Sequence, residues 1–236
     1  MWEVEHSDFK MLEKANYQKA DFNKLVEIYM RAAKEKEKNF GSTYSTTFLK
    51  NALRAISVLT SKEALQEIKT LDQLEEYLIS KANELKMPPY YIVVWTHFVT
   101  DKKFGATPED LAQFMFKYIV QRLANNGFNI EKQKIEIDQF LSKFRKLAVD
   151  IKIAPLEFGY RKNSDGSIDI YHKDCHFFEG CERIWETHLL TKSDGRAICG
   201  VVQIIIHFLK AATGKEWDQA ILEFGRTGCI ARCFPT

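Results

Sequence analysis

The spacing of apolar residues changes once along this chain, and that change limits the folds it can adopt. Up to about residue 150, apolar side chains recur every three or four positions, as Leu25, Val26 and Tyr29 do. This spacing predicts amphipathic helices. From Ile151 onward, apolar residues alternate with polar ones over short stretches, which predicts β-strands. The two patterns together predict a fold of the α+β class.

The first hundred residues predict a helical N-terminal region, residues 1–100. Helices are expected over 21–38, 45–59 and 71–86, where apolar residues follow the helical period. Pro88 and Pro89 then interrupt the pattern. The apolar run 90–95 is too short for its spacing to separate a strand from a buried helix, so its structure stays open at this point.

Residues 101–236 predict a separate α+β domain. A helix is expected to begin after Thr107, because a capping residue, Pro108 and two acidic residues follow one another there. A further helix is expected over about 133–148. Two β-hairpins with turns at 163–166 and 225–228 then flank an apolar helix over 198–212. This order predicts an antiparallel sheet covered by helices.

Charge and hydropathy exclude several classes of partner. The chain has 34 Lys and Arg against 32 Asp and Glu, a formal charge of +2, which is too small to attract nucleic acid. The apolar run 201–209 is interrupted by Gln203 and His207, so we expect no membrane span. The first residues lack the pattern of a signal peptide. We therefore expect a cytoplasmic protein with reduced or metal-bound cysteines.

The five cysteines all lie after residue 174. Cys199 opens the apolar helix, Cys229 and Cys233 share one face of the last strand, and Glu223 lies across the turn from them. If the helix start packs against this hairpin, three thiolates and a carboxylate meet, a set that Zn²⁺ accepts in tetrahedral geometry. The alternative is that the cysteines are small buried apolar residues, since no C-x-x-C motif is present.

Over residues 107–236 the chain resembles the 4-vinyl-reductase-type ligand-binding domain, a relative of TRAPP vesicle-tethering subunits and of methanogen output domains. The matching positions are Cys199-Gly200, the helix to Gly214, Glu223, Cys229, Cys233-Phe234 and the earlier Asp174-Cys175-His176-Phe177. Cys229 follows Glu223 at a longer interval than in the family. The resemblance implies a structural zinc ion, with ligands among Cys175, Cys199, Glu223, Cys229 and Cys233.

The resemblance also implies a pocket for a small hydrophobic molecule between the helices and the sheet. The chain supplies an apolar and aromatic lining for such a pocket, namely Phe114, Met115, Tyr118, Phe140, Phe144, Phe158, Tyr160, Ile205 and Phe208. The alternative is that these residues form an ordinary core. The expected function is the binding or sensing of a small hydrophobic molecule, with no catalytic residue assigned.

Two other functions fit the same sequence. A thiol- or metal-dependent reductase or hydrolase would use Cys175 or Cys181 as nucleophile and His172 or His176 as base. An assembly subunit comparable to the vesicle tethers would use its aromatic helices as the face of a homodimer. The sequence contains no Gly-rich phosphate loop, nucleophile elbow or H-E-x-x-H motif, so the binding module is preferred over the enzyme.

Overall fold

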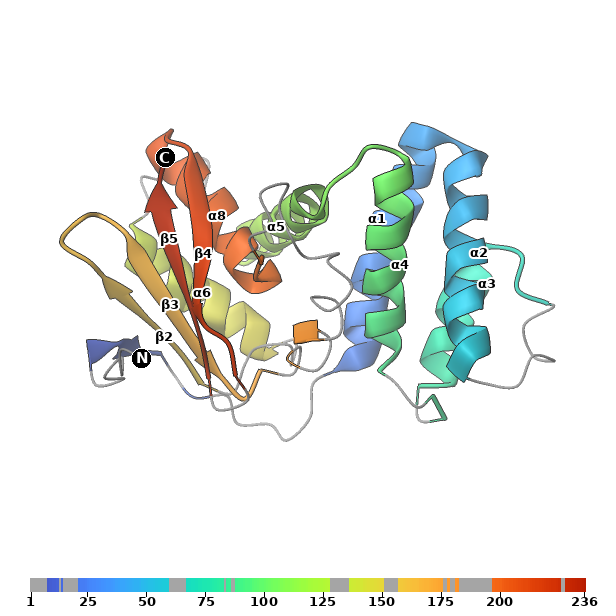
Figure 1. Cartoon of the computed structure of the whole chain (residues 1–236), viewed down its shortest axis with the longest axis horizontal. Coiled ribbons are helices and arrows are strands. Elements are labelled where there is room, and N and C mark those ends of the chain that lie inside the picture. The colour runs from blue at the N-terminus through green and yellow to red at the C-terminus, as the bar shows by residue number, and fades with distance from the viewer. Residues whose placement is uncertain are drawn as a thin grey trace. The chain divides into compact units, whose positions relative to one another are not determined.

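The computed structural model describes residues 8–12, 14, 21–59, 67–82, 84–85, 88–127, 136–150, 157–175, 178, 181–182, 197–225 and 228–236. These residues form helices and one antiparallel sheet (Figure 1), which confirms the α+β class. The chain divides into two compact units, residues 21–114 and residues 1–20 together with 115–236. The expected boundary at residues 100–101 lies within the first of these units, and β1 (Lys10–Met11) pairs with a strand of the second.

The helical unit contains α1 (Phe22–Phe40), α2 (Ser42–Leu59), α3 (Leu71–Ser80) and α4 (Pro89–Lys103). Local signals fix several of these ends. Asp21 caps α1 by accepting a hydrogen bond from the backbone N–H of Lys24. Thr70 and Gln73 form a reciprocal capping box at the start of α3. The helix expected over 71–86 therefore starts as predicted, but it ends at Ser80.

The segment 90–95, which the sequence left open, is part of α4. Pro89 occupies the first turn, where its missing N–H costs nothing. Ten residues between Pro89 and Asp101 are buried, so the helix shows no apolar stripe because most of its sides are covered. In the part of the chain that the structure describes, no helix combines the length and the apolar character needed to cross a bilayer.

Helix α5 (Pro108–Asn125) begins where the sequence predicted and continues across the boundary between the two units. Its start is fixed by Asp110, whose Oδ2 accepts hydrogen bonds from both the backbone N–H and the hydroxyl of Thr107. The helix expected over 133–148 is α6 (Ile137–Asp150).

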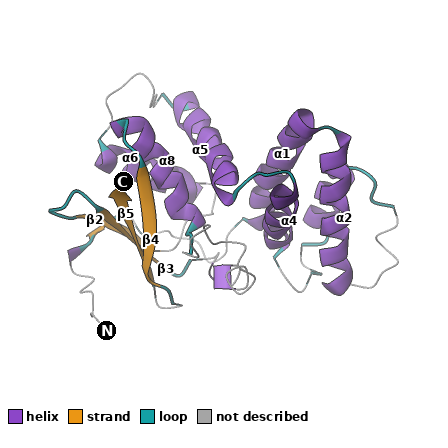
Figure 2. Cartoon of the chain, turned by 45° about the horizontal axis from the view of Figure 1, so that its top comes forward, coloured by secondary structure: helices purple, strands orange, loops and turns teal. Residues whose placement is uncertain are grey.

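The C-terminal unit contains the sheet, in the order β1-β2-β3-β5-β4, with every neighbouring pair antiparallel. Both predicted hairpins are present, formed by β2 (Glu157–Lys162) with β3 (Ile168–Lys173) and by β4 (Trp217–Glu223) with β5 (Cys229–Pro235). Helix α8 (Gly200–Thr213) lies between them in the chain. Helices α6 and α8 lie against one face of the sheet (Figures 1 and 2). We call this the inner face.

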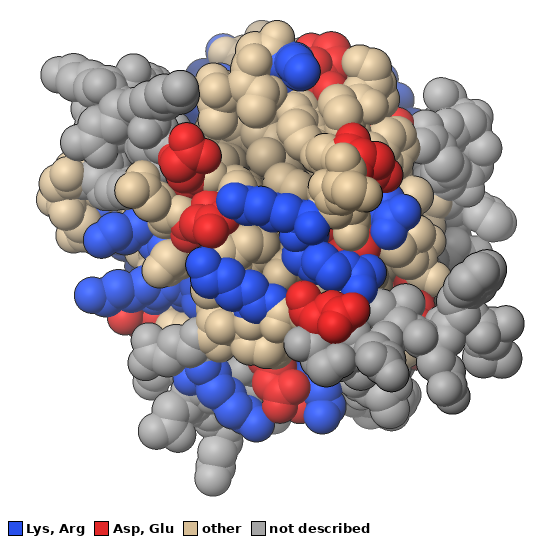
Figure 3. All heavy atoms as spheres, turned by 90° about the vertical axis from the view of Figure 1, so that its left-hand side faces the viewer, with Lys and Arg blue, Asp and Glu red and all other residues tan. Residues whose placement is uncertain are grey.

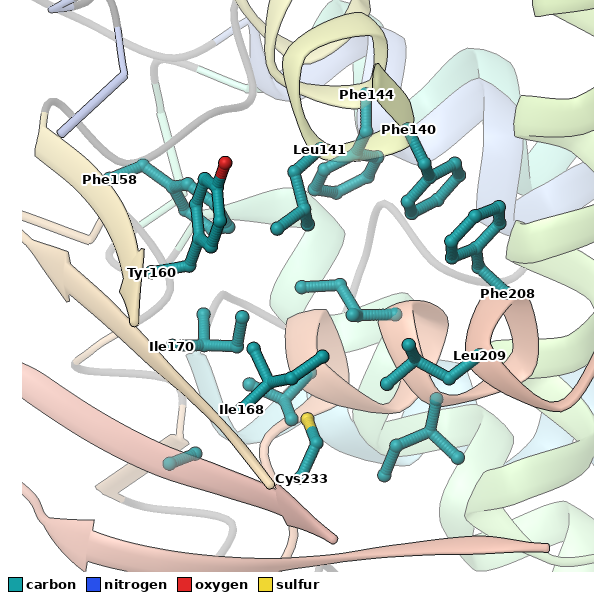
Figure 4. Packing of buried hydrophobic residues seen from close by; sticks show 14 of the residues in the cluster. Phe140, Leu141, Phe144, Phe158, Tyr160, Ile168, Ile170, Phe208, Leu209 and Cys233 are labelled. Carbon is teal, nitrogen blue, oxygen red and sulfur yellow. The ribbon is translucent and has the colours of Figure 1, made fainter. Parts of the chain in front are cut away.

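The core of this unit is packed between the inner face and these two helices (Figure 4). Phe140 of α6 and Phe208 of α8 stack with their ring centroids 3.7 Å apart. Phe144 meets Phe158 of β2 edge to face at 6.3 Å. These four side chains are 8% exposed or less, so they contact one another instead of bordering open space.

The opposite, outer face carries a buried ion network. Asp169 is fully buried and accepts two hydrogen bonds from Arg232, at 2.6 and 3.0 Å, and one from Arg161 at 2.9 Å. The Arg161 guanidinium also lies 4.8 Å from the centroid of the Phe9 ring. Figure 3 shows the side of the molecule that lies to the left in Figure 1, and basic and acidic side chains are interspersed there, which is the pattern of a solvated surface.

Candidate functional site

The strand register places His172 on the inner face of the sheet. Its strand neighbours of the same parity, Ile168 and Ile170, belong to the core, and His172 itself is only 4% exposed. Across the β3–β5 pair, His172 lies directly opposite Cys229. Side chains at opposed positions share a face and come close together, so an imidazole and a thiol are neighbours in the interior.

A second thiol reaches this position from the start of α8. Cys199 is the N-cap residue of that helix and is 8% exposed. Its Sγ atom lies 3.6 Å from Nε2 of His172. The other ring nitrogen, Nδ1, is buried and has no hydrogen-bond partner among the described residues. The pair is therefore a buried thiol and imidazole in direct contact, with one polar atom of the ring still unsatisfied.

Burial controls the protonation of these groups. It lowers the pKa of His172 to about 4 and raises the pKa of Cys199 to about 11, against the backbone N–H groups of Val202 and Val201, which lower it. At neutral pH the protein alone therefore holds a neutral imidazole beside a protonated thiol. This state suits a soft metal ion, which binds neutral imidazole and displaces the proton of a thiol.

Two further thiols belong to the same neighbourhood. Burial raises the pKa of Cys181 well above its ordinary value, and negative charge on Cys175, Cys199 and Cys229 would raise it further. In the same way, burial and the charge of Glu223 raise the pKa of Cys229, and burial and the charge of Cys199 raise the pKa of Cys233. Cys175 and Cys181 are both half-buried, whereas His176 lies outside the described residues.

The structure separates Cys233 from Cys229 and His172, although burial and the charge of Cys199 raise the pKa of the Cys233 thiol. Cys229 and Cys233 are both on the inner face of β5, as predicted, but four residues of extended strand separate them by about 13 Å. Cys233 pairs with Ile168 and is completely buried in the apolar core, with its sulfur pointing among the core side chains (Figure 4). The predicted face of the strand is correct for both cysteines. The distance between them is too large for one ion, because ligands of one ion must lie within a few ångströms of each other.

Glu223 leaves the inner face of the sheet, although, together with burial, its charge raises the pKa of the Cys229 thiol. A register irregularity between Ile221 and Glu223 pairs Glu223 with Ile230. Ile230 clusters with Phe9 and Tyr171 on the outer face, so the bulge carries Glu223 away from the inner face. On a regular hairpin without the bulge, the side chain of Glu223 would lie on the inner face, as expected from the sequence. The expected set of Cys199, Glu223, Cys229 and Cys233 is therefore not assembled.

One pair of the remaining donors has the spacing of zinc ligands. In a tetrahedral site with Zn–S of about 2.3 Å and Zn–N of about 2.05 Å, the sulfur and nitrogen ligands are about 3.6 Å apart. Sγ of Cys199 and Nε2 of His172 have this separation. Among the described residues, no group of three or more His, Cys, Asp or Glu is arranged to hold a metal ion. The structure thus supplies one well-placed pair of donors with other thiols nearby.

The residues expected to line a pocket have several different environments. Phe144, Phe158, Tyr160 and Phe208 are members of the core cluster, and Tyr118 packs against it while its hydroxyl accepts a hydrogen bond from Arg122. Met115 is buried, and Phe114 is half-buried at the end of the helical unit. This distribution matches the alternative of an ordinary core for the stacked aromatic residues.

Comparison of the chain with family models, with curated proteins and with solved structures finds no match. The function is therefore argued from the site alone. Sequence reasoning named His172 without placing it on the inner face, and it missed Gln219, a buried amide beside Cys199. The alternation of 168, 170 and 172 could have placed His172, because residues two apart on a strand share a face.

Proposed function

We propose that the C-terminal unit is a binding module whose interior holds a structural zinc ion at the Cys/His cluster. His172 and Cys199 would be two ligands at their present separation, Cys229 a third, and Cys175 or Cys181 the fourth. The observation that carries the proposal is the 3.6 Å contact between the buried Cys199 thiol and the buried His172 imidazole, which lies opposite the buried Cys229 in the sheet. Bound zinc would hold α8, β3 and β5 together.

Burial favours a structural ion over a catalytic one. Structural zinc sites are closed by four protein ligands, whereas catalytic sites keep a position open to water or substrate. His172, Cys199 and Cys229 are each 8% exposed or less. The same burial disfavours the thiol enzyme, since a nucleophilic cysteine needs a lowered pKa and access to substrate, and burial raises the pKa of Cys181.

The finer part of the proposal is the ligand. We infer a small hydrophobic molecule as the bound species, on the strength of the resemblance over residues 107–236 and of the apolar interior next to the cluster. Native mass spectrometry of the purified protein would report a copurified molecule and the number of subunits together. A protein that carries no such molecule and binds none from a panel of apolar compounds would contradict this part while leaving the zinc site in place.

The zinc site is tested by metal content and by cobalt absorption. Protein purified without chelators should contain one zinc per chain by elemental mass spectrometry, and Co²⁺ added to the metal-free protein should give thiolate-to-cobalt charge-transfer bands. Cys199→Ser and His172→Gln should lose the metal. Cys233→Ala is the matched control, because it removes a buried thiol of the same sheet face about 13 Å along β5 from Cys229. A wild-type protein without metal, or a Cys233→Ala variant that also loses it, would overturn the proposed site.

A further inference from the structure

Three segments of the chain meet at one end of the helical unit. Helix α1 ends at Phe40, Gly41 turns the chain at φ 75°, and α2 begins at Ser42. Helix α4 ends at the same place, since the ring centroids of Phe40 and Phe104 are 5.6 Å apart. Figure 1 shows this end at the top of the helical unit, where α1 turns into α2 and α4 leads toward α5.

An aromatic ring is exposed to solvent at this end. Phe40 is 42% exposed, although the rest of its surface packs against Phe104 and Tyr44. Tyr44 is completely buried, and its ring centroid lies 5.9 Å from that of Phe40. The ring of Phe40 therefore rests on a fixed base. Covering its open side would remove apolar surface from water at a small cost in side-chain freedom.

Three lysines flank the two exposed rings in the chain. Lys38 lies in the last turn of α1, and Lys102 and Lys103 lie in the last turn of α4. All three are exposed, and none forms a salt bridge with another residue that the structure describes. Lysines at these positions stabilise the C-terminal ends of helices through the helix dipole. This role explains the charges but not the exposed ring beside them.

The acidic side chains of this end do not balance the lysines. Asp101 is 1% exposed and is paired with Lys36. Asp110, beyond the turn that follows α4, accepts hydrogen bonds from Thr107. Glu37 is half-buried on α1. The exposed charge around the rings is therefore mainly positive, so its complement is an anionic surface.

We propose that this end of the helical unit docks on an anionic lipid surface, with the ring of Phe40 entering the headgroup layer. The contacting side chains are Lys38, Phe40, Lys102, Lys103 and Phe104. A one-residue turn between two helices is convex, and a protruding ring among lysines fits the boundary between headgroups and acyl chains. An acidic peptide would instead need a groove or a free strand edge. The inference concerns the helical unit and does not depend on the Cys/His cluster of the other unit.

The test measures how full-length protein sediments with vesicles of phosphatidylcholine, with and without phosphatidylserine. The wild-type protein should bind only the vesicles that contain phosphatidylserine, and it should bind them less at high salt, because salt screens the lysines. Replacing Lys102 and Lys103 together by glutamine should weaken binding by about 25-fold, which is about fivefold for each lysine. Phe40→Ala should weaken it by about tenfold, because the ring no longer leaves water.

Two matched controls should keep the wild-type binding. Lys50→Gln removes an exposed lysine of α2 that lies two turns from Ser42. Leu222→Ala removes a side chain that is 43% exposed in the C-terminal unit. Together they separate the proposed surface from a general effect of charge or exposed apolar area.

The outcomes decide the proposal. Wild-type protein that stays in solution with both kinds of vesicle overturns it, and so does a double lysine variant or a folded Phe40→Ala variant that binds like the wild type. Circular dichroism checks folding. The lysine variant changes only exposed side chains, so it decides the question if Phe40→Ala is unfolded. Wild-type protein that ignores the vesicles and binds a polyglutamate peptide would assign this surface to an acidic protein partner and also overturns the proposal.

Discussion

The imidazole of His172 and the thiol of Cys199 are in contact at 3.6 Å although 27 residues separate them in the chain. The contact forms because β3 presents His172 on the inner face of the sheet and α8 begins with Cys199 directly above that face. Both groups are buried and neutral at pH 7, as the direction of both pKa shifts requires. Three predictions concern this contact and the packing of the C-terminal unit, and a fourth concerns the helical unit.

Removal of zinc should lower the stability of the C-terminal unit. A ligand that binds only the folded state raises the free energy of unfolding. The increase grows with the ratio of the ligand concentration to Kd and is about 4 kcal/mol at a ratio of one thousand. A strong chelator should therefore lower the melting temperature in differential scanning calorimetry. Cys199→Ser should melt at the same temperature with and without the chelator. A wild-type melting curve that the chelator leaves unchanged would count against the zinc site.

Cys233 should matter for packing alone. Replacement by serine places a hydroxyl in a completely buried apolar position, which should cost about 1 to 3 kcal/mol in the free energy of unfolding. Alanine avoids the polar atom and should cost less. Guanidinium unfolding gives both values, and the zinc content of both variants should equal that of the wild type. A serine variant as stable as the alanine variant would show that this position is not apolar.

Phe208 should behave as a core residue. It is completely buried and stacked on Phe140 with a centroid distance of 3.7 Å. Phe208→Ala leaves a cavity between α6 and α8 and should lower the free energy of unfolding by about 3 to 5 kcal/mol. Leu222→Ala is the control, because Leu222 is 43% exposed and surface changes stay within about 0.5 kcal/mol. A small effect at Phe208 would mean that its ring borders a pocket, as the sequence first suggested.

The helical unit should lose stability in acid through Asp101. This carboxylate is 1% exposed and accepts a hydrogen bond from Tyr44 at 2.8 Å, with Lys36 paired to its other oxygen. Burial raises the pKa of Asp101, but the hydrogen bonds and positive charge of His97 and Lys36 outweigh it and lower the pKa below its ordinary value of 3.8. The stabilising contribution of the ionised group is therefore complete above pH 3.8 and is lost as pH falls through the lower, folded-state pKa.

Asp101→Asn measures this contribution. At pH 7 it should lower the free energy of unfolding by about 1.5 to 3 kcal/mol, the range for hydrogen bonds to a charged group. The difference from wild type should shrink as pH is lowered below 3.8. Hydrogen–deuterium exchange of peptides from α2 and α4 reports the helical unit separately. A difference between the two proteins that stays constant from pH 7 to pH 3 would be the contrary result.

The candidate site shows where sequence patterns stop being informative. The alternation of side chains along a strand correctly placed Cys229 and Cys233 on one face. Alternation gives no information on the distance between two residues, and four residues of strand span about 13 Å. The position of Glu223 depended on a bulge, which one extra residue creates and which no local pattern announced. His172 was recognisable as a donor, but its partner came from a different element.

The sequence by itself determined the class of the fold, both hairpins and most helix ends, because apolar periodicity, capping residues and turn glycines act over a few neighbouring residues. Gly166, at φ 82°, closes the turn of the first hairpin for this local reason. Only the tertiary structure decided which donors meet. The strand order that sets β5 between β3 and β4 and the seating of α8 by Gln219 bring Cys199 to His172. Such contacts depend on packing between elements distant in the chain.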